Sequence, residues 1–402
     1  MNNTRFHNSP EQYFAAAKKS ILKGLESGRL TDDDATLIRD YVDEKSSRLS
    51  PSRYYKTVST LVTVRKYFAV EFRKAKKNDY YAAMNKMRYA NKPDGTSYKK
   101  NTIADYTKFT KRFFTWLAEE NHVEIKPDHI QKFATEKFDR KTKSNEDVLS
   151  AEEITAIIGK AKSAKYKALL GILYEGGFRI SEVASLRWRD ITPVDFGFKI
   201  QTDGKTGYDR NLPIRTYQNY LAQWRVAYPG DPTGDAFVFI TPSGKPLQYR
   251  GVAKAIKGFV KEAGITKNVT LHSFRHSRIT HALSGGMQET VAKKAFWGNE
   301  STDMIASYSH LVDDDVDNAM AALSGVDIGK KKVKEAPRPV QCPECHYINP
   351  PSTRFCGDCG QPLTVEAIRD VESAQKKLLK IMQEQPSFAL QVLEKTKHEK
   401  TE

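Results

Sequence analysis

The clearest chemical motif in this chain of 402 residues is a pair of Cys-x2-Cys sequences. The first holds Cys342 and Cys345, the second holds Cys356 and Cys359, and these are all four cysteines of the sequence. Each pair of thiolates makes one tight knuckle, and four thiolates complete a tetrahedral metal site with no open position. The spacing therefore predicts a structural Zn²⁺ ion; two local disulfides or an iron site are the alternatives.

A second candidate site would be built from residues that lie far apart in the sequence. Arg179 follows two glycines that allow a sharp turn into a helix, where backbone N–H groups favour an anion. Glu182, three residues on, is placed to hold the Arg179 guanidinium. Lys205 lies in the turn sequence Gly-Lys-Thr-Gly, where an ammonium group could protonate a leaving oxygen or act as a point charge.

The rest of this set follows in the order histidine, arginine, asparagine and tyrosine. His272 and Arg275 are three residues apart, so on a helix they share a face. Histidine can exchange a proton near neutral pH, and arginine can hold two phosphate oxygens. Tyr308 lies nine residues after Asn299. Taken alone, each of these residues is equally well explained as a structural or a solvated side chain. The whole set, in this order, indicates phosphate chemistry.

The composition favours a polyanionic partner. Lys and Arg number 65 against 49 Asp and Glu, a formal net charge of +16, which suits nucleic acid or an anionic membrane surface and excludes an acidic solvating tail. A hydrophobic content of 39% can support packed cores. No apolar run approaches the roughly 20 residues of a membrane helix, and residues 1–10 lack the apolar centre of a secretory signal. We therefore expect a cytoplasmic protein associated with the nucleoid.

The elements that must position these residues begin with a helical segment. From residue 11 to about 132, apolar side chains recur every three or four positions, as in Ile103, Tyr106 and Phe109, and Thr102 is expected to cap that helix. Lys and Arg fall between the apolar stripes from residue 18 to residue 112. A solvated helix face and a DNA-facing surface are equally good explanations of those charges.

The following segment is expected to mix helices with a small sheet. The sequence at 136–149 is charged and aperiodic, which is typical of a linker, and Ser150 with Glu153 then forms a capping box. Strands are predicted at 198–200 and 211–214 with the Lys205 turn between them, and helices follow to about residue 324.

The ordered motifs resemble those of the tyrosine recombinase, or phage integrase-like, family of site-specific recombinases. The motifs are FRISE at 178–182, GKTG with Arg210 and Pro213 beyond it, HSFRH at 272–276, WGN at 297–299 and YSH at 308–310. The resemblance is specific over about 150–324 and looser over 11–132, which looks like the helical core-binding domain of the family. The cysteine module resembles a zinc ribbon, which is not a usual tail for these recombinases.

The resemblance implies a catalytic set. Arg179, Lys205, His272, Arg275 and Tyr308 match the catalytic positions of the family, whereas Asn299 stands where the family usually has His or Trp. Tyr308 would form a 3′-phosphotyrosine, the arginines would neutralise the phosphate, His272 would assist proton transfer, and Lys205 would protonate the leaving 5′-oxygen. Asn299 can donate a hydrogen bond but cannot shuttle a proton. Catalysis would need no metal.

The resemblance also implies the organisation of the chain. The expected fold class is mainly α with a small β-sheet in an α+β catalytic domain, a helical N-terminal core-binding domain, and a C-terminal zinc ribbon plus helix. The predicted segments are a helical core-binding (SAM-like) DNA-binding domain at 1–135, a linker at 136–149, a catalytic domain at 150–326, a basic linker at 327–341, a zinc-ribbon-like module at 342–363 and a helical tail at 364–402.

The resemblance finally implies a function and its partners. We expect a recombinase that integrates or excises a mobile element, acting as a homo-tetramer on duplex DNA with specific recombination sites. A type IB topoisomerase shares the chemistry and is the alternative enzyme. A DNA-binding regulator with the same fold and weakened catalysis is the other alternative, and Asn299 is the feature that favours it.

Overall fold

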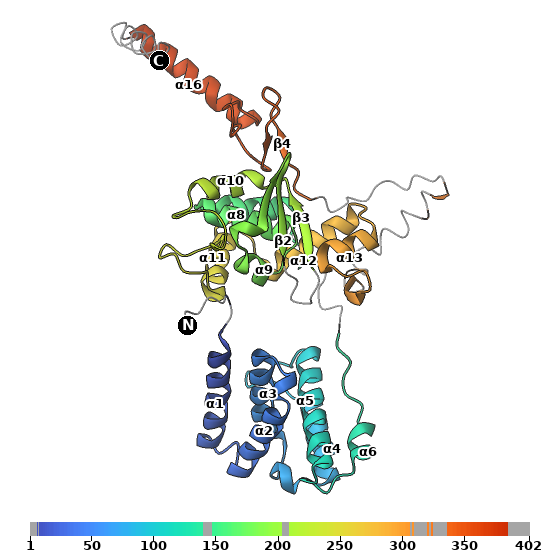
Figure 1. Ribbon diagram of the computed structural model, residues 1–402. Helices are drawn as coiled ribbons and strands as arrows, with labels where there is room; N and C mark the ends of the chain where they lie inside the picture. Colours follow the sequence, from blue (N-terminus) through green and yellow to red (C-terminus); the bar gives the residue numbers. More distant parts are fainter. Residues whose placement is uncertain are drawn as a thin grey trace. The chain divides into compact units, whose positions relative to one another are not determined.

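The computed structural model describes residues 6, 8–139, 147–202, 209–305, 308, 320, 323–324 and 336–384. The chain divides into two compact units, Met1–Thr142 and Lys143–Glu402, called unit 1 and unit 2 (Figure 1). The division falls within the charged segment 136–149. In the part of the chain that is described, no helix is long and apolar enough to cross a lipid bilayer.

Unit 1 is a helical bundle with an aromatic core. Its helices are α1 (Pro10–Glu26), α2 (Asp32–Glu44), α3 (Pro51–Val64), α4 (Lys77–Arg88), α5 (Lys100–Glu119) and α6 (Pro127–Lys132), with 3-10 turns at Ser46–Arg48, Arg65–Tyr67 and Phe72–Lys74. Phe72, Phe113 and Phe114 are fully buried and meet edge to face, which stabilises the bundle beyond simple area burial.

Local sequence signals explain where these helices begin, with one exception. Ser9 and Gln12 form a capping box at the start of α1. The expectation that Thr102 caps α5 is wrong: the helix begins at Lys100, with Lys99 at the N-cap position. The Thr102 N–H already bonds the Lys99 carbonyl at 2.8 Å, so Thr102 belongs to the first helical turn.

Unit 2 surrounds a small sheet with helices. The helices of its described residues are α7 (Ala151–Lys160), α8 (Ala164–Glu175), α9 (Ile180–Ser185), α10 (Gln218–Val226), α11 (Tyr249–Glu262), α12 (Leu271–Ser284), α13 (Glu289–Trp297) and α16 (Val365–Glu384), with 3-10 turns at Trp188–Asp190 and Asp303–Ile305. Ser150 and Glu153 form the predicted capping box of α7. Helix α8 is buried continuously from Ala168 to Tyr174 and packs against α7, α9, α10 and α12.

The main sheet is an antiparallel meander in the order β1 (Ile191–Val194), β2 (Gly197–Thr202) and β3 (Arg210–Ile214). The sequence predicted β2 and β3 but missed β1. Only Ile191 of that edge strand is buried, and Pro193 interrupts its donors, so the alternation that reveals a strand is weak there.

Over the residues that the structure describes, the chain is mainly helical with two small antiparallel sheets, which confirms the predicted fold class. The second sheet pairs β4 (Val340–Gln341) with β5 (Ile348–Asn349) beside the cysteines. We call residues 340–363 the ribbon; α16 follows it directly.

Candidate active site and metal centre

Tyr308 is buried, with 5% of its surface exposed. Its ring lies 4.9 Å from the His276 ring and 5.9 Å from the Trp297 ring, measured between centroids. Burial raises the pKa of the Tyr308 phenol, while the positive charges of Arg275 and Arg179 act to lower that pKa. The fold therefore brings both predicted arginines within electrostatic range of the predicted nucleophile.

Arg275 is held from several sides. It lies on α12 with 2% of its surface exposed. One terminal nitrogen donates to the Gly177 carbonyl, and the other donates to the Phe296 carbonyl at 2.6 Å. The guanidinium carbon lies 5.5 Å from the centre of the Trp297 ring. These contacts fix the guanidinium plane before any phosphate arrives, which is the preorganisation that a charge clamp needs.

Arg179 occupies the N-cap position of α9 and is the more open of the two arginines. Its Nη1 donates to Glu182 Oε1 at 2.9 Å, and its backbone N–H donates to Glu182 Oε2 at 2.7 Å, so the predicted Arg179–Glu182 contact is present. The turn before it requires glycine: Gly177 has φ +53°, and a Cβ there would come within 2.8 Å of the Phe296 ring.

Arg210 is a third arginine of this cluster, and sequence reasoning gave it no role. It begins β3, is 2% exposed, and pairs with Glu182 Oε2. It also donates to the Phe296 carbonyl at 3.1 Å, the same oxygen that receives Arg275. Arg210 and Ile214 are four residues apart, so on a strand their side chains lie on the same face. That spacing is the signal in the sequence, because Ile214 is apolar and its face is the buried one.

We call Arg179, Arg210 and Arg275 the arginine cluster. Arg179 and Arg210 both pair with the Glu182 carboxylate, whereas Arg275 is held by backbone carbonyls, so the one carboxylate leaves positive charge in excess. Burial, and then the charges of Arg210 and Arg179, lower the pKa of Arg275 to about 9. Arg275 is therefore protonated at neutral pH but short of compensating charge, an environment that favours a bound anion.

Two histidines of α12 lie in different surroundings. His272 is in the first turn and exposed, whereas Arg275, one turn on, is buried. His276 is 4% exposed and is the histidine whose ring lies against Tyr308. The three-residue spacing placed His272 and Arg275 on the same helix correctly, but it could not tell which side of that helix faces the core.

Asn299 is part of a turn. Its Oδ1 accepts the Ser301 N–H at 2.8 Å, directly after Gly298 ends α13 with φ +71°. The side-chain oxygen is thus engaged, and a contact with phosphate would have to come from the amide NH₂ group. Lys205 and the rest of its turn, 203–208, lie outside the described residues.

The four cysteines converge. All four Sγ atoms lie within 4.8 Å of one another, with 3.6 Å between Cys342 and Cys359 and 3.5 Å between Cys345 and Cys356. A disulfide requires about 2.05 Å between sulfurs, whereas thiolates about 2.3 Å from one ion stand close to 3.8 Å apart. The cysteines are free, and their arrangement fits a tetrahedral zinc ion.

The two knuckles have the same backbone geometry. The N–H of His346 bonds the Cys342 carbonyl at 3.0 Å, and the N–H of Gly360 bonds the Cys356 carbonyl at 3.1 Å. His346 and Gly360 both have left-handed φ values, +58° and +76°. Each Cys-x2-Cys segment thus turns in the same way and presents its two thiols on one side.

The ribbon contacts the rest of unit 2 through Asn219 of α10. The Asn219 amide donates to the Ile348 carbonyl at 2.5 Å, and its oxygen accepts the Tyr347 hydroxyl at 2.7 Å. A hollow of about 690 Å³ between α10 and the ribbon lies beside this contact.

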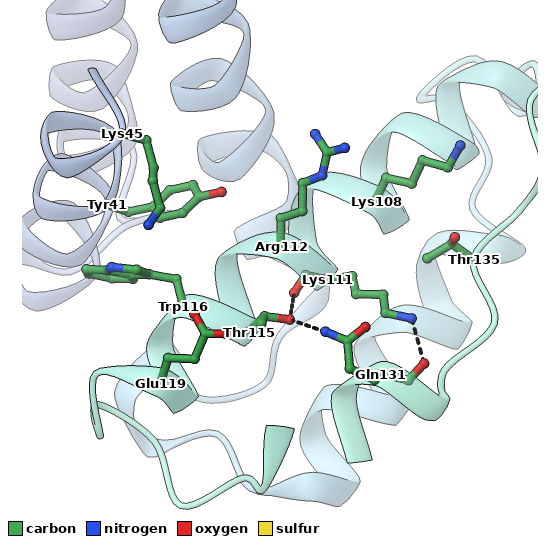
Figure 2. Close-up of a pocket in the computed structure, with 10 residues that line it drawn as sticks. All are labelled: Tyr41, Lys45, Lys108, Lys111, Arg112, Thr115, Trp116, Glu119, Gln131 and Thr135. Carbon is green, nitrogen blue, oxygen red and sulfur yellow. Dashed lines mark hydrogen bonds between the residues drawn. The ribbon is translucent and has the colours of Figure 1, made fainter. Parts of the chain in front are cut away.

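A basic pocket of about 480 Å³ lies in unit 1 (Figure 2). Tyr41 and Trp116 form apolar walls, and α5 contributes Lys108, Lys111 and Arg112. Lys111 donates to the Gln131 carbonyl at 2.7 Å, whereas Figure 2 shows Arg112 and Lys108 extending from α5 without turning back to that carbonyl. The basic pocket can therefore offer cations to an anionic ligand.

Comparison with known families and sequences gives consistent results. A model described as the phage integrase family matches residues 147–314, a range that ends before the ribbon. Tyrosine recombinase XerD of Oceanobacillus iheyensis is 29% identical over 220 residues, which cover 52% of this chain and 71% of that protein. Tyrosine recombinase XerC of Herpetosiphon aurantiacus is 28% identical over 226 residues, covering 54% and 71%.

Solved structures show the same fold. Lambda integrase residues 75–356 bound to DNA superposes with a TM-score of 0.53 at 14% identity, covering 68% of this chain and 96% of that one. The XerH site-specific recombinase bound to palindromic difH substrate gives 0.50 at 16% identity, covering 80% and 99%.

Proposed function

Because this chain belongs to the phage integrase family of tyrosine recombinases and is a site-specific DNA recombinase, we propose that it cuts DNA through a covalent 3′-phosphotyrosine formed by Tyr308. The observation that carries the proposal is the burial of Tyr308 against the Trp297 ring, which Arg275 also contacts, with the charges of Arg275 and Arg179 near enough to lower the pKa of the Tyr308 phenol. A phenol serves both as nucleophile and, later, as leaving group.

In the cleavage step, the Tyr308 oxygen bonds to phosphorus, the bond from phosphorus to the 5′-oxygen breaks, and the phenol loses its proton. Arg275 and Arg179 neutralise charge on the non-bridging oxygens, and the bonds that fix Arg275 make it ready to do so. Lys205 protonates the departing 5′-oxygen, and His272 accepts the proton that the Tyr308 phenol loses. Asn299 donates its amide N–H to the phosphate. Attack by a 5′-hydroxyl reverses the step and rejoins the strand.

We further propose that duplex DNA carrying specific recombination sites is the substrate, that four copies act together, and that the reaction integrates or excises a mobile element. In this proposal the segment boundaries are those predicted from the sequence. Residues 1–135 bind DNA, and residues 150–326 form the catalytic domain. The four-cysteine site binds one structural Zn²⁺, held by Cys342, Cys345, Cys356 and Cys359.

The test of catalysis uses nicked duplexes from the DNA that flanks the gene. The wild-type chain should form an adduct that survives denaturation, and Tyr308→Phe should form none, because phenylalanine has no nucleophilic oxygen. Tyr217→Phe, which also removes a hydroxyl from a buried tyrosine of unit 2, is the matched control and should still form the adduct. An adduct with Tyr308→Phe would show that another residue is the nucleophile.

Two other outcomes would favour the alternatives. Tight DNA binding by the wild-type chain without any adduct would favour the regulator, and Asn299→His would then be the first change to test for recovery of cleavage. Relaxation of supercoils without joining of two defined sites would favour a type IB topoisomerase.

The contribution of the basic pocket to DNA binding is tested by its salt dependence. Arg112→Gln should reduce the slope of log affinity against log salt by about 1, since one phosphate contact releases about one counterion. Arg29→Gln changes another exposed arginine of unit 1, outside the basic pocket, and should change the slope less. Equal slopes for Arg112→Gln and the wild-type chain would mean that the basic pocket does not contact DNA.

A further inference from the structure

Arg210, at the start of β3, lies among groups that come from three other segments of unit 2. Its Nη2 donates to the Glu182 carboxylate of α9, and its Nη1 donates to the Phe296 carbonyl of α13 at 3.1 Å. Its guanidinium carbon lies 5.2 Å from the centre of the Phe178 ring, in the turn before α9. One side chain of the sheet is thus bonded to two helices at once.

The two groups that Arg210 binds are the groups that hold the other two arginines of the cluster. The Glu182 carboxylate accepts Nη1 of Arg179 at 2.9 Å, and the Phe296 carbonyl accepts Nη2 of Arg275 at 2.6 Å. A guanidinium is planar, and its donors stand at fixed angles to one another. Arg210 therefore fixes the distance from the Glu182 carboxylate on α9 to the Phe296 carbonyl on α13.

The position of Arg210 is costly for stability. Its side chain is buried beside two other guanidinium groups, and its Nε has no hydrogen-bond partner among the residues that the structure describes. Burial and the charge of Arg179 lower the pKa of Arg210, against the opposing effect of the Glu182 charge. An apolar side chain of similar length would avoid these costs. Arg210 is therefore better explained by what its bonds do for the site than by what they add to stability.

We propose that Arg210 is a positioning residue that sets the separation of Arg179 and Arg275, so that these two guanidinium groups fit the two non-bridging oxygens of one phosphate. The inference rests on the proposed cleavage by Tyr308, in which both arginines bind that phosphate. Without Arg210, each of the two arginines keeps its own bonds, but α9 and α13 lose the link that spaces them. A displacement of about 1 Å between groups of an active site can cost on the order of 100-fold in rate.

The first test compares two nicked duplexes that differ only at the scissile phosphate. One carries an ordinary phosphodiester, and the other carries a methylphosphonate, taken as separated stereoisomers, which keeps one non-bridging oxygen and has no charge. On the phosphodiester, Arg210→Met should slow single-turnover adduct formation on the order of 100-fold relative to the wild-type chain. On the methylphosphonate, the variant should be within about threefold of wild type, because one remaining oxygen does not require two arginines at a fixed separation.

Arg278→Met is the matched control, since Arg278 is a partly buried arginine of α12 that donates to the Glu175 carbonyl and lies outside the arginine cluster. This control should not distinguish between the two duplexes. Equal slowing of Arg210→Met on both duplexes, or no slowing on the phosphodiester, would overturn the proposal. If Arg210→Met does not fold, Arg210→Lys takes its place with the same expectation, because an ammonium group lacks the planar fork.

The second test uses only the phosphodiester and determines whether Arg210 acts through Arg275. With Arg275→Ala already present, no pair of guanidinium groups is left to space, so Arg210→Met should slow adduct formation further by no more than about threefold. A further slowing as large as in the wild-type background would show that Arg210 is an independent phosphate contact and would overturn the proposal. A wild-type chain that forms no adduct would overturn the proposed function itself. Failure of either test with an active wild-type chain would overturn only the role of Arg210.

Discussion

The four-cysteine site and the arginine cluster, both in unit 2, depend on very different lengths of chain. The cysteines lie within one short segment, and each knuckle is closed by hydrogen bonds between residues four apart. The arginine cluster draws on the start of α9, the first residue of β3, the second turn of α12 and a carbonyl near the end of α13. The first site needs only its own turns and a metal, whereas the second needs a complete folded unit.

The two sites also differ in how their charges are balanced. Four thiolates are compensated by the ion they would bind, so that site is stable only when loaded. The arginine cluster is held without a ligand, by the Glu182 carboxylate and by backbone carbonyls such as those of Gly177 and Phe296. Its excess positive charge is unfavourable in the free protein, and a bound phosphodiester would relieve it.

The largest effect is expected from a change within the arginine cluster. Arg275→Ala should slow cleavage on the order of 10²–10³-fold, because a fixed charge opposite the transition-state phosphate is lost. The zinc content should be unchanged. The measurement is single-turnover adduct formation on nicked DNA, with the thermal midpoint followed in parallel.

A matched control for Arg275→Ala lies one turn further along α12. Arg278 donates to the Glu175 carbonyl at 2.9 Å and is partly buried, so Arg278→Ala removes an arginine without removing a phosphate clamp. We expect a loss of stability with cleavage much closer to wild type. Equal slowing by both variants would mean that Arg275 acts only through the fold of α12.

An intermediate effect is expected from loss of the metal ligands. In the variant Cys342→Ser with Cys345→Ser, zinc measured by elemental analysis should fall from about one equivalent to less than half, because two thiolates cannot complete a tetrahedral site. Cleavage should stay within about threefold of wild type, since the sites share no residue. Loss of cleavage would contradict the independence of the two sites and show that the ribbon helps to assemble the active site.

The sequence predicted best what short segments determine. The capping box of Ser150 and Glu153 and the contact between Arg179 and Glu182 each join residues three apart, and both are present. The convergence of the cysteines follows from two knuckles of the same type. At these positions the partners are already neighbours along the chain, so their spacing carries the geometry.

What the sequence could not supply is the side of each element that faces the core. Arg210 takes part in the cluster because β3 directs it toward Glu182, and His276 contacts Tyr308 because α12 turns that face inward. Asn299 has its side-chain oxygen in a turn with Ser301, a local bond that competes with any ligand. These outcomes depend on packing between elements that lie far apart in the sequence.

The smallest effect is expected where the two sites are connected. Asn219→Ala removes both hydrogen bonds between α10 and the ribbon, each worth about 1 kcal/mol. Hydrogen exchange in residues 340–363 should therefore become roughly tenfold faster or more. Zinc content should be unchanged, because the knuckles close on themselves. Gln223→Ala, an exposed change on the same helix beside the same hollow, is the matched control and should not alter exchange.

Cleavage by Asn219→Ala decides whether the sites are independent. A continuous route does exist: the Glu175 carboxylate accepts the N–H groups of Thr216 and Tyr217 before α10, at 2.8 and 3.0 Å, and Glu175 ends the helix that leads to Arg179. These bonds lie within the catalytic unit and do not involve the ribbon, so we expect them to hold α10 in place when the ribbon is released. Cleavage should then match wild type. Slowing approaching that of Arg275→Ala would mean that the ribbon acts on Arg179 through α10 and Glu175, and the zinc would regulate the enzyme as well as stabilise its tail.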